Sequence, residues 1–177
     1  MKALVVYESM YGNTRAVAES VAEGLRAASV ATELMPVRDA QHQHVTTVDL
    51  LVIGGPTHVH SMTRPKTRHA AVEQADAHHL TVEDEAEGTG VREWLQGLPA
   101  MSGTSAAAFD TRVDMAKLLS GQASHAIAKS LRRHGFHLVL SPESFLVDSN
   151  TVLVAGERER AVEWGRQLAK ALTQVHA

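Results

Sequence analysis

The sequence has no cysteine among its 177 residues, and aromatic residues make up only 4% of the chain. The absence of cysteine excludes disulfide bonds, thiolate metal sites and a cysteine nucleophile. No apolar run is long enough to cross a bilayer, and the N-terminal MKALVVYESM has no small-residue cleavage site of a signal peptide. We therefore expect a cytoplasmic protein without a membrane span.

A strong charge of either sign is also missing. The formal net charge is -3 and the isoelectric point is about 6.4, and neither value indicates nucleic acid as a partner. The length and the ordinary hydrophobic content of 44% suit one domain with a core of its own, spanning residues 1–177. We expect most of the 11 histidines to be solvated surface residues.

Short apolar runs alternate with amphipathic helical patterns about five times along the chain. The runs predict strands at residues 3–7, 32–37, 48–56 and 104–110, and a fifth strand made of FHLVL and SFLV with an interruption between them. Helical periodicity follows the first run, and a final helix is predicted over residues 156–172. The alternation predicts an α/β fold in which a parallel sheet carries helices on both faces.

One segment, from about residue 62 to 90, departs from this alternation and is interpreted as a longer irregular insertion. RPKTRHAAVEQA predicts a short helix with Pro65 in its first turn, and the acidic HHLTVEDEAEGTG that follows predicts a loop. Irregular stretches of this length within a compact domain are functional or partly mobile.

The junction between the first strand and the first helix, YESMYGNTRAV at residues 7–17, collects hydroxyl, amide and glycine residues. Helix N-termini have free N–H groups and favour anions. Ser9 and Thr14 add hydroxyls, Asn13 adds an amide, and Gly12 lets the backbone approach a ligand closely. The junction therefore predicts a phosphate site. The alternative is an ordinary helix cap with a turn, which favours the same residue types.

ALVVYESMYGNTRAVAESVAEGL resembles the first strand, phosphate loop and first helix of the flavodoxin family, whose loop typically reads Ser/Thr-x-Thr-Gly-x-Thr. Tyr11 stands here in place of the middle threonine. DLLVIGGPTHVHSM resembles the third strand and the loop that covers one flavin face, and AAAFDTRVD lies where the fourth-strand loop meets the flavin pyrimidine. GERERAVEWGRQLA is similar to the last helix, so the resemblance covers nearly the whole chain except residues 62–90.

The resemblance implies a flavodoxin-like three-layer sandwich with a five-stranded parallel sheet in the order 2-1-3-4-5, and noncovalently bound FMN. Carried over by position, the phosphate ligands would be Ser9, Met10, Tyr11, Gly12, Asn13 and Thr14. One flavin face would be lined by Pro56, Thr57, His58, Val59 and His60. The pyrimidine and the other face would be contacted by Phe109, Asp110, Thr111 and Arg112.

The two flavin loops contain no tryptophan or tyrosine, and THVHSM has no glycine. His58 or His60 could stack on the ring, Arg112 could lie over its face, and a histidine there could supply a proton. Neither histidine pair, His42 with His44 or His58 with His60, has a carboxylate at a spacing that completes a metal site, so we expect none. The basic runs RPKTRH and RRHGFH are either solvated surface or a patch for an acidic partner or a phosphate-bearing substrate.

Three functions fit these observations. The first is electron transfer by an FMN-binding protein, between redox partner proteins or a small-molecule donor and acceptor. The second is an FMN-dependent NAD(P)H or quinone-type reductase, and the third is a flavin-free fold that acts as a binding or regulatory module. The sequence favours electron transfer because it contains no evident substrate or nicotinamide motif. It leaves the catalytic residues and the oligomeric state open.

Overall fold

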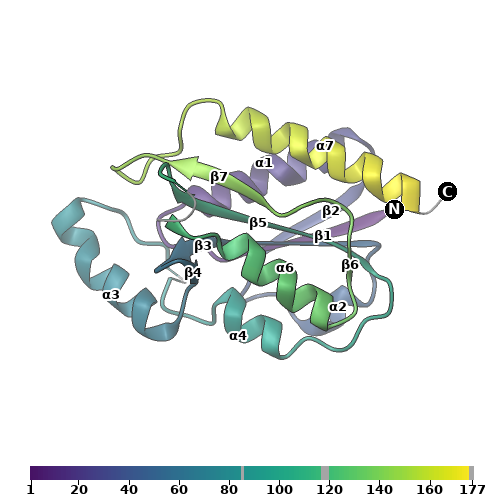
Figure 1. Ribbon diagram of the computed structural model, residues 1–177, viewed down its shortest axis with the longest axis horizontal. Helices are drawn as coiled ribbons and strands as arrows, with labels where there is room; N and C mark the ends of the chain where they lie inside the picture. Colours follow the sequence, from purple (N-terminus) through teal and green to yellow (C-terminus); the bar gives the residue numbers. More distant parts are fainter. Residues whose placement is uncertain (85, 117–119, 176–177) are drawn as a thin grey trace.

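The computed structural model describes residues 1–84, 86–116 and 120–175. A sheet forms the middle layer between two layers of helices (Figure 1). The parallel strands of its main path run in the order β2-β1-β3-β5-β6, which confirms the predicted fold class. The strands are β1 (Lys2–Tyr7), β2 (Ala31–Pro36), β3 (Leu50–His58), β4 (Ser61–Met62), β5 (Ser105–Val113), β6 (His137–Leu138) and β7 (Glu143–Val147).

The sheet has seven strands, so the predicted number of five is corrected. β4 adds an antiparallel pairing to the end of β3. The fifth position is shared by β6 and β7, which pair in parallel with opposite ends of β5. Pro142 lies in the break between them, and proline has no N–H to donate to a strand ladder. The order differs from the predicted 2-1-3-4-5 in its labels, and it agrees with the prediction once the hairpin strand β4 is left out and β6 and β7 are counted as one interrupted strand.

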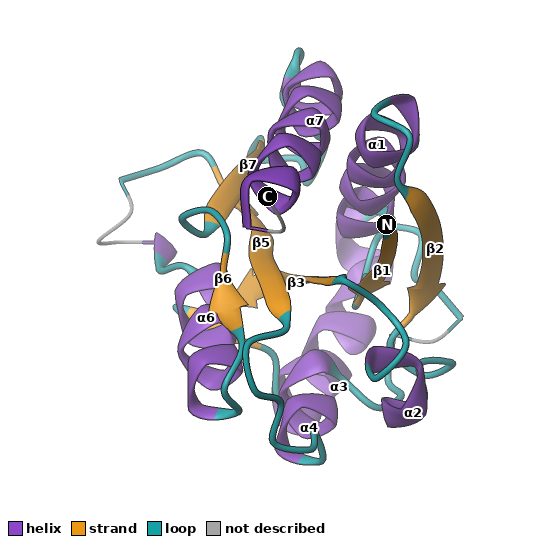
Figure 2. Ribbon diagram, turned by 90° about the vertical axis from the view of Figure 1, so that its right-hand side faces the viewer, coloured by secondary structure: helices purple, strands orange, loops and turns teal. Residues whose placement is uncertain are grey.

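Helices cover both faces of the sheet (Figure 2). One face carries α1 and α7, and the other carries α2, α4 and α6. The helices are α1 (Asn13–Ala27), α2 (His42–Val45), α3 (Pro65–Ala75), α4 (Val91–Gln96), α6 (Ala123–Arg133) and α7 (Glu157–Val175), with a short 3-10 helix at Asp76–His78. None of the described helices is long and apolar enough to cross a membrane.

The apolar run of β1 is continuous because the strand is buried on both faces. Its side chains alternate between the two layers. Val5 joins the core under α1 and α7, and Leu4 and Val6 join the core under α2, α4 and α6. Side chains alternate in the same way along β3 and β5. The sequences of β1, β3 and β5 are therefore almost continuously hydrophobic.

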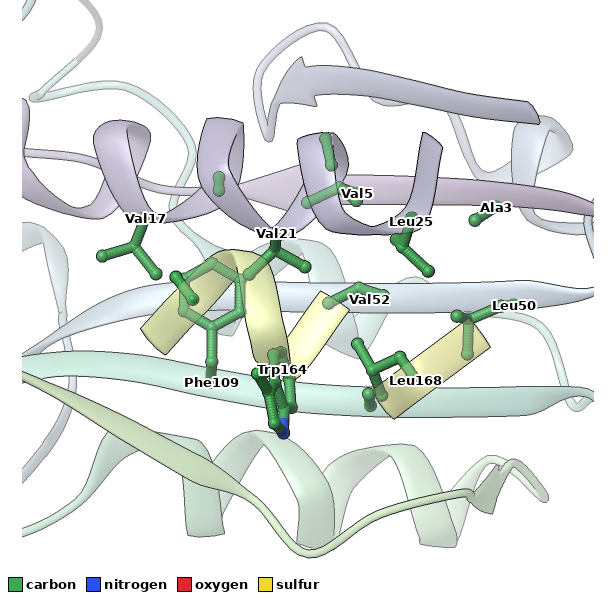
Figure 3. Close-up of a cluster of buried hydrophobic side chains, with 14 of the residues drawn as sticks. Ala3, Val5, Val17, Val21, Leu25, Leu50, Val52, Phe109, Trp164 and Leu168 are labelled. Carbon is green, nitrogen blue, oxygen red and sulfur yellow. The ribbon is translucent and has the colours of Figure 1, made fainter. Parts of the chain in front are cut away.

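Trp164 anchors the core beneath α1 and α7, as its place on the apolar stripe of the last helix predicts (Figure 3). Its ring lies 6.1 Å from the rings of both Phe109 and Phe145, in edge-on contacts. The two helices approach closely at Gly24 and Gly165, where an added Cβ would lie 2.0 Å from Val162 O and 2.4 Å from a backbone oxygen of α1, respectively. This close approach fixes α1, and with it the loop that precedes the helix.

The insertion begins with β4 and contains the predicted helix as α3, with Pro65 at its start. Its described acidic part, residues 79–84 and 86–90, forms no helix or strand. This part returns to the first loop of the chain, because the Glu83 N–H donates to Met10 O at 2.9 Å. The insertion therefore lies beside the junction of β1 and α1.

Candidate functional site

The loop between β1 and α1 presents the start of a helix without a side-chain cap. Gly12 precedes the helix with a φ of 86°, a left-handed conformation that glycine adopts without strain. Its carbonyl accepts the N–H of Ala16 at 3.0 Å, while its own N–H donates to Ser9 Oγ at 3.1 Å. The first N–H groups of α1 have no intrahelical partner, and their position favours an anion.

A hollow with about 510 Å³ of empty space lies beside this loop. Its lining comes from segments at or beyond the carboxyl ends of β1, β3, β5 and β7, which is where ligands bind in open α/β sheets. The lining residues are Met10, Tyr11, Asn13, Thr14, Pro56, Thr57, His58, Thr111, Arg112, Val113, Val147 and Thr151.

Nine of the 15 residues that the sequence predicts for the site line this hollow: Met10, Tyr11, Asn13, Thr14, Pro56, Thr57, His58, Thr111 and Arg112. Ser9 and Gly12 form the turn beneath it. Val59 and His60 line an adjoining hollow that also contains Arg112. The structure thus gathers three separated segments at one place, and their contacts with a ligand stay a prediction.

Phe109 and Asp110 are not brought to the hollow. Phe109 lies in the core under α1 and α7. Asp110 points to the opposite face, where its Oδ2 accepts the N–H of Ser124 at 2.7 Å, and burial raises the pKa of its carboxyl group. Adjacent residues of a strand face opposite sides of the sheet, so both side chains are inside the protein.

Polar side chains of the loop tie it to its neighbours. The hydroxyls of Thr14 and Thr111 are 2.7 Å apart, and Asn13 Nδ2 donates to Thr151 O at 2.7 Å. The Tyr11 hydroxyl donates to Ala71 O in α3 at 2.9 Å. These bonds hold the loop against β5, the segment after β7 and the insertion.

Sequence reasoning missed Glu83, whose carboxylate lies beside the loop. Its Oε1 is 3.1 Å from Arg15 NH2, and the side chain is only 13% exposed. A Cβ added to Gly12 would lie 3.0 Å from the same oxygen. A carboxylate of the chain therefore sits near the uncapped start of α1, which agrees with the preference of this position for an anion. In the sequence, Glu83 belongs to an acidic run that reads as a solvated loop.

A buried carboxylate, Glu8, fastens the insertion to the end of β1. Its Oε2 accepts the N–H of Val91 at 2.8 Å, and its Oε1 accepts the hydroxyl of Thr63. Arg68 completes the network by donating to Thr63 Oγ1 at 3.0 Å and pairing with Glu93 at 3.1 Å. Burial raises the pKa of Glu8. The network joins both ends of the insertion to the strand that leads into the loop.

The turn after β3 projects Val59 and His60 beside the hollow. Both residues have positive φ, 45° and 69°, as a two-residue hairpin turn between β3 and β4 requires. Positive φ is rare for a β-branched residue, and the Val59 side chain is 79% exposed. Gly121 packs so closely on this turn that an added Cβ would lie 2.2 Å from His60 Cα. Strained backbone of this kind is concentrated at functional sites.

His58 lies at the edge of the hollow. Burial lowers the pKa of its imidazole, and the nearby charge of Arg68 lowers it further.

The described histidines do not form a metal site. His42 Nε2 lies 3.0 Å from Trp94 O, and the His42 ring packs on the Trp94 ring. Within the described parts of the chain, no group of three or more histidine, aspartate or glutamate residues could hold a metal ion.

Comparison with known proteins shows what this chain is similar to. The family model described as Flavodoxin matches residues 5–91. No curated protein sequence matches the chain. A flavodoxin from the domain Archaea is 20% identical, with a TM-score of 0.66 over 98% of this chain and 99% of its own.

Two further structures show the same fold. Oxidised Flavodoxin 1 from Bacillus cereus is 17% identical, with a TM-score of 0.67 over 96% of this chain and 98% of its own. The Flv1 flavodiiron core from Synechocystis sp. PCC6803 is 17% identical, with a TM-score of 0.64 over 98% of this chain but 36% of its own. The resemblance to the flavodoxin family is thus confirmed, in sequence over residues 5–91 and in fold over nearly the whole chain.

Proposed function

We propose that this protein binds FMN noncovalently and acts in electron transfer in the cytoplasm. The observation that carries the proposal is the hollow at the carboxyl ends of the strands, with the uncapped start of α1 at one side. A phosphomonoester attached to a flat ring needs an anion site next to an elongated, partly apolar cavity. The chain offers both within one connected set of loops.

The phosphate end fits the donors present. Backbone N–H groups of Asn13 and Thr14 begin the helix, and Gly12 keeps the approach free of a side chain. A hydrogen bond to a charged group contributes about 1.5–3 kcal/mol, so a few such bonds hold a phosphate without a positive side chain. The guanidinium of Arg15 is also close to the helix start, where it pairs with the carboxylate of Glu83.

The ring end fits through aliphatic contacts where many flavin sites have aromatic ones. Met10, Pro56, Val113 and Val147 supply apolar lining, and Thr57 and Thr111 lie between them. When bound, FMN supplies one- and two-electron redox chemistry at this place.

Arg112 brings a positive charge to the ring side of the hollow. Its NH1 donates to the carbonyl oxygens of Val113 and Met115 and to Ser120 Oγ. Its Nε is buried without a hydrogen-bond partner among the described residues. The fixed guanidinium favours negative charge on a bound group.

The surface around the hollow supports electron transfer to another protein. Four of the large apolar side chains that are exposed lie on segments bordering the hollow: Val59, Val113, Met115 and Val152. A cluster of exposed apolar side chains marks an interaction site, and redox encounters use small interfaces. Electrons would pass where the edge of the ring meets this rim.

The test is the visible absorption spectrum of the purified protein, before and after addition of excess FMN and desalting. We expect retained flavin bands close to one equivalent. A colourless protein after reconstitution would overturn the FMN proposal and support the binding or regulatory module.

A reductase is the second candidate, because the hollow adjoins a cation-lined groove through His58. Mixing FMN-loaded protein with NADH or NADPH under argon separates the two. Rapid bleaching without an added reductase protein establishes the reductase, whereas a carrier stays oxidised.

A further inference from the structure

Two stretches of the chain carry positive charge and no negative charge. Residues 50–72 and 115–142 contain no aspartate or glutamate and hold seven of the 17 lysine and arginine residues. The other ten share the rest of the chain with all 20 acidic residues. In the fold the two stretches meet, because α6 packs against β3 and β4 (Figure 1). The helix α6 also contacts α4, which carries Arg92. A protein of net negative charge thus carries a distinct positive region.

Two hollows mark this region, with about 370 and 610 Å³ of empty space. The first is lined by His58, Arg64 and Thr67, and the second by Lys129 and Arg133. They share Met62 and Arg92. We call the two hollows together the cationic groove. Among the described residues, no carboxylate lines either hollow.

Arg92 is fixed at the boundary between the two hollows. Its Nε donates to Thr63 O at 2.8 Å and its NH2 donates to Met62 O at 2.8 Å. Both partners are neutral carbonyl groups, so the guanidinium keeps its full charge, and NH1 makes no further bond to a described residue. A preorganised guanidinium of this kind binds phosphate oxygens with little loss of side-chain freedom.

The other cations of the groove are also without a counter-ion. Arg64, Lys129 and Arg133 form no ion pair with any described residue, whereas Arg15, Arg68 and Arg160 elsewhere are paired with glutamates. Four positive side chains around two connected concavities repel one another, and a bound anion would relieve that repulsion. The observation points to a ligand with at least two negative groups.

We propose that the cationic groove binds a small nucleotide through two separated phosphate groups, one beside Arg64 and Arg92 and the other beside Lys129 and Arg133. His58 lines both the first hollow of the groove and the hollow proposed for FMN. The uncharged end of the nucleotide would therefore extend toward the flavin site. This relation, which rests on the reductase candidate of the proposed function, makes a reduced nicotinamide nucleotide the class of small-molecule electron donor that the site would accept.

The shape of the groove favours a small ligand over an acidic protein. Stable protein interfaces bury about 800 Å² on each side around an apolar centre. The groove instead consists of two concavities whose large apolar lining is limited to Val59, Met62 and Leu95. Nucleotide phosphates match forked guanidinium donors within such concavities.

The test is calorimetric titration with adenosine 2′,5′-bisphosphate at low salt, on both flavin-free and FMN-loaded protein. We expect saturable binding that falls by about tenfold in Arg133→Glu and in Lys129→Glu, because each substitution reverses a charge beside a phosphate. The matched control is Arg132→Glu. It changes the charge equally on the same exposed part of α6, but Arg132 does not line the groove. The affinity of the Arg132→Glu variant for the nucleotide should stay within about threefold of that of the unsubstituted protein.

Absence of binding at millimolar nucleotide, or equal losses in the Arg132 and Arg133 variants, would overturn the proposal. Binding of a polyglutamate peptide in place of the nucleotide, lost in Arg133→Glu alone, would overturn it in favour of an acidic protein. Flavin absorbance of the same samples reports the FMN proposal separately. Nucleotide binding by a protein that retains no flavin would contradict the FMN proposal and support the groove proposal. Circular dichroism verifies that every variant folds.

Discussion

The loop between β1 and α1 and the cationic groove offer two different ways to bind phosphate. The loop uses neutral backbone donors at a helix start and is bordered by the carboxylate of Glu83. The groove uses four charged side chains and has no carboxylate among its described lining residues. Backbone donors act at short range and demand an exact fit, whereas unpaired cations act through a field that reaches several ångströms.

The difference assigns different tasks to the two regions. A preorganised loop suits a cofactor that stays bound, because its amides are held in place by the bonds of Asn13 and Thr14 to neighbouring segments. An exposed set of cations suits a ligand that arrives and leaves, because electrostatic attraction speeds association. The predictions below test this division, beginning with the largest effect.

Substitution of Gly12 by aspartate should have the largest effect on the loop. The new Cβ would lie 3.0 Å from Glu83 Oε1, and the new carboxylate would repel both Glu83 and a phosphate. We expect FMN affinity to fall by about 100-fold or more, the result of losing several charged hydrogen bonds. Folding stability should fall by only about 1–2 kcal/mol, the cost of a left-handed conformation outside glycine. Fluorescence titration of FMN and urea unfolding measure the two quantities.

Gly12→Asn is the control, since asparagine tolerates positive φ and has the same shape without the charge. It should bind FMN more tightly than the aspartate variant. Unchanged FMN affinity in Gly12→Asp would place the phosphate elsewhere.

The second largest effect is the difference in salt dependence between ligand binding at the groove and at the loop. Raising sodium chloride from about 50 to 500 mM shortens the screening length to a few ångströms. Nucleotide affinity at the groove should then fall by about tenfold, whereas FMN affinity at the loop should change by less than about threefold. Titrations of both ligands over a salt series measure the two slopes. Equal slopes would contradict the assignment of neutral donors to the loop and cations to the groove.

Removing the charge of Glu83 should produce a smaller effect of the opposite sign. Glu83→Gln keeps the size of the side chain and frees Arg15 for the phosphate, so FMN affinity should rise by about three- to tenfold. Loss of the Arg15 pair costs at most about 1 kcal/mol of stability, because Arg15 is half exposed.

The control for Glu83→Gln comes from the same acidic segment. Glu87→Gln removes a charge that faces His69 rather than the loop, so it should leave FMN affinity unchanged. Weaker FMN binding in Glu83→Gln would show instead that this carboxylate is part of the cradle.

The sequence predicts the parts of the fold that depend on local signals. Alternating apolar runs locate the strands. The serine, glycine and asparagine of the first loop predict a phosphate site, and its contacts with a ligand stay a prediction. The end of β5 is predicted less accurately. The strand extends to Val113, three residues beyond the predicted end at residue 110. The hollow consequently meets the strand at Thr111, Arg112 and Val113. Phe109 lies in the core under α1 and α7, and Asp110 is buried against Ser124.

Other parts of the site depend on contacts between distant segments. Glu83 reaches the loop because the insertion folds back on it, and Thr151 reaches Asn13 from the far end of the chain. The groove needs Arg92 from α4 and Arg133 from α6 to face the same hollow. No periodicity or motif encodes these contacts, since they follow from the packing of α6 against β4 and α4.

The smallest effect is the difference in proton affinity between His58, which precedes the insertion, and His69, which lies within it. Burial, and then the charge of Arg68, lower the pKa of His58 below its usual value of 6.5. The hydrogen bond to Glu87, and then the charge of Glu73, raise the pKa of His69. Nuclear magnetic resonance titration should give midpoints on opposite sides of 6.5, with His58→Asn and His69→Asn variants used for assignment.

Stability should follow these shifts in opposite directions. Folded protein binds fewer protons at His58 than the unfolded chain does, so the contribution of His58 is present above pH 6.5 and is lost as the pH falls through its lowered pKa. His69 contributes below pH 6.5, and its contribution is lost as the pH rises through its raised pKa. Urea unfolding from pH 5 to 8 should therefore show a shallower decline on acidification in His58→Asn. An unchanged profile would mean that the imidazole of His58 is open to water and that the hollow is wet at that edge.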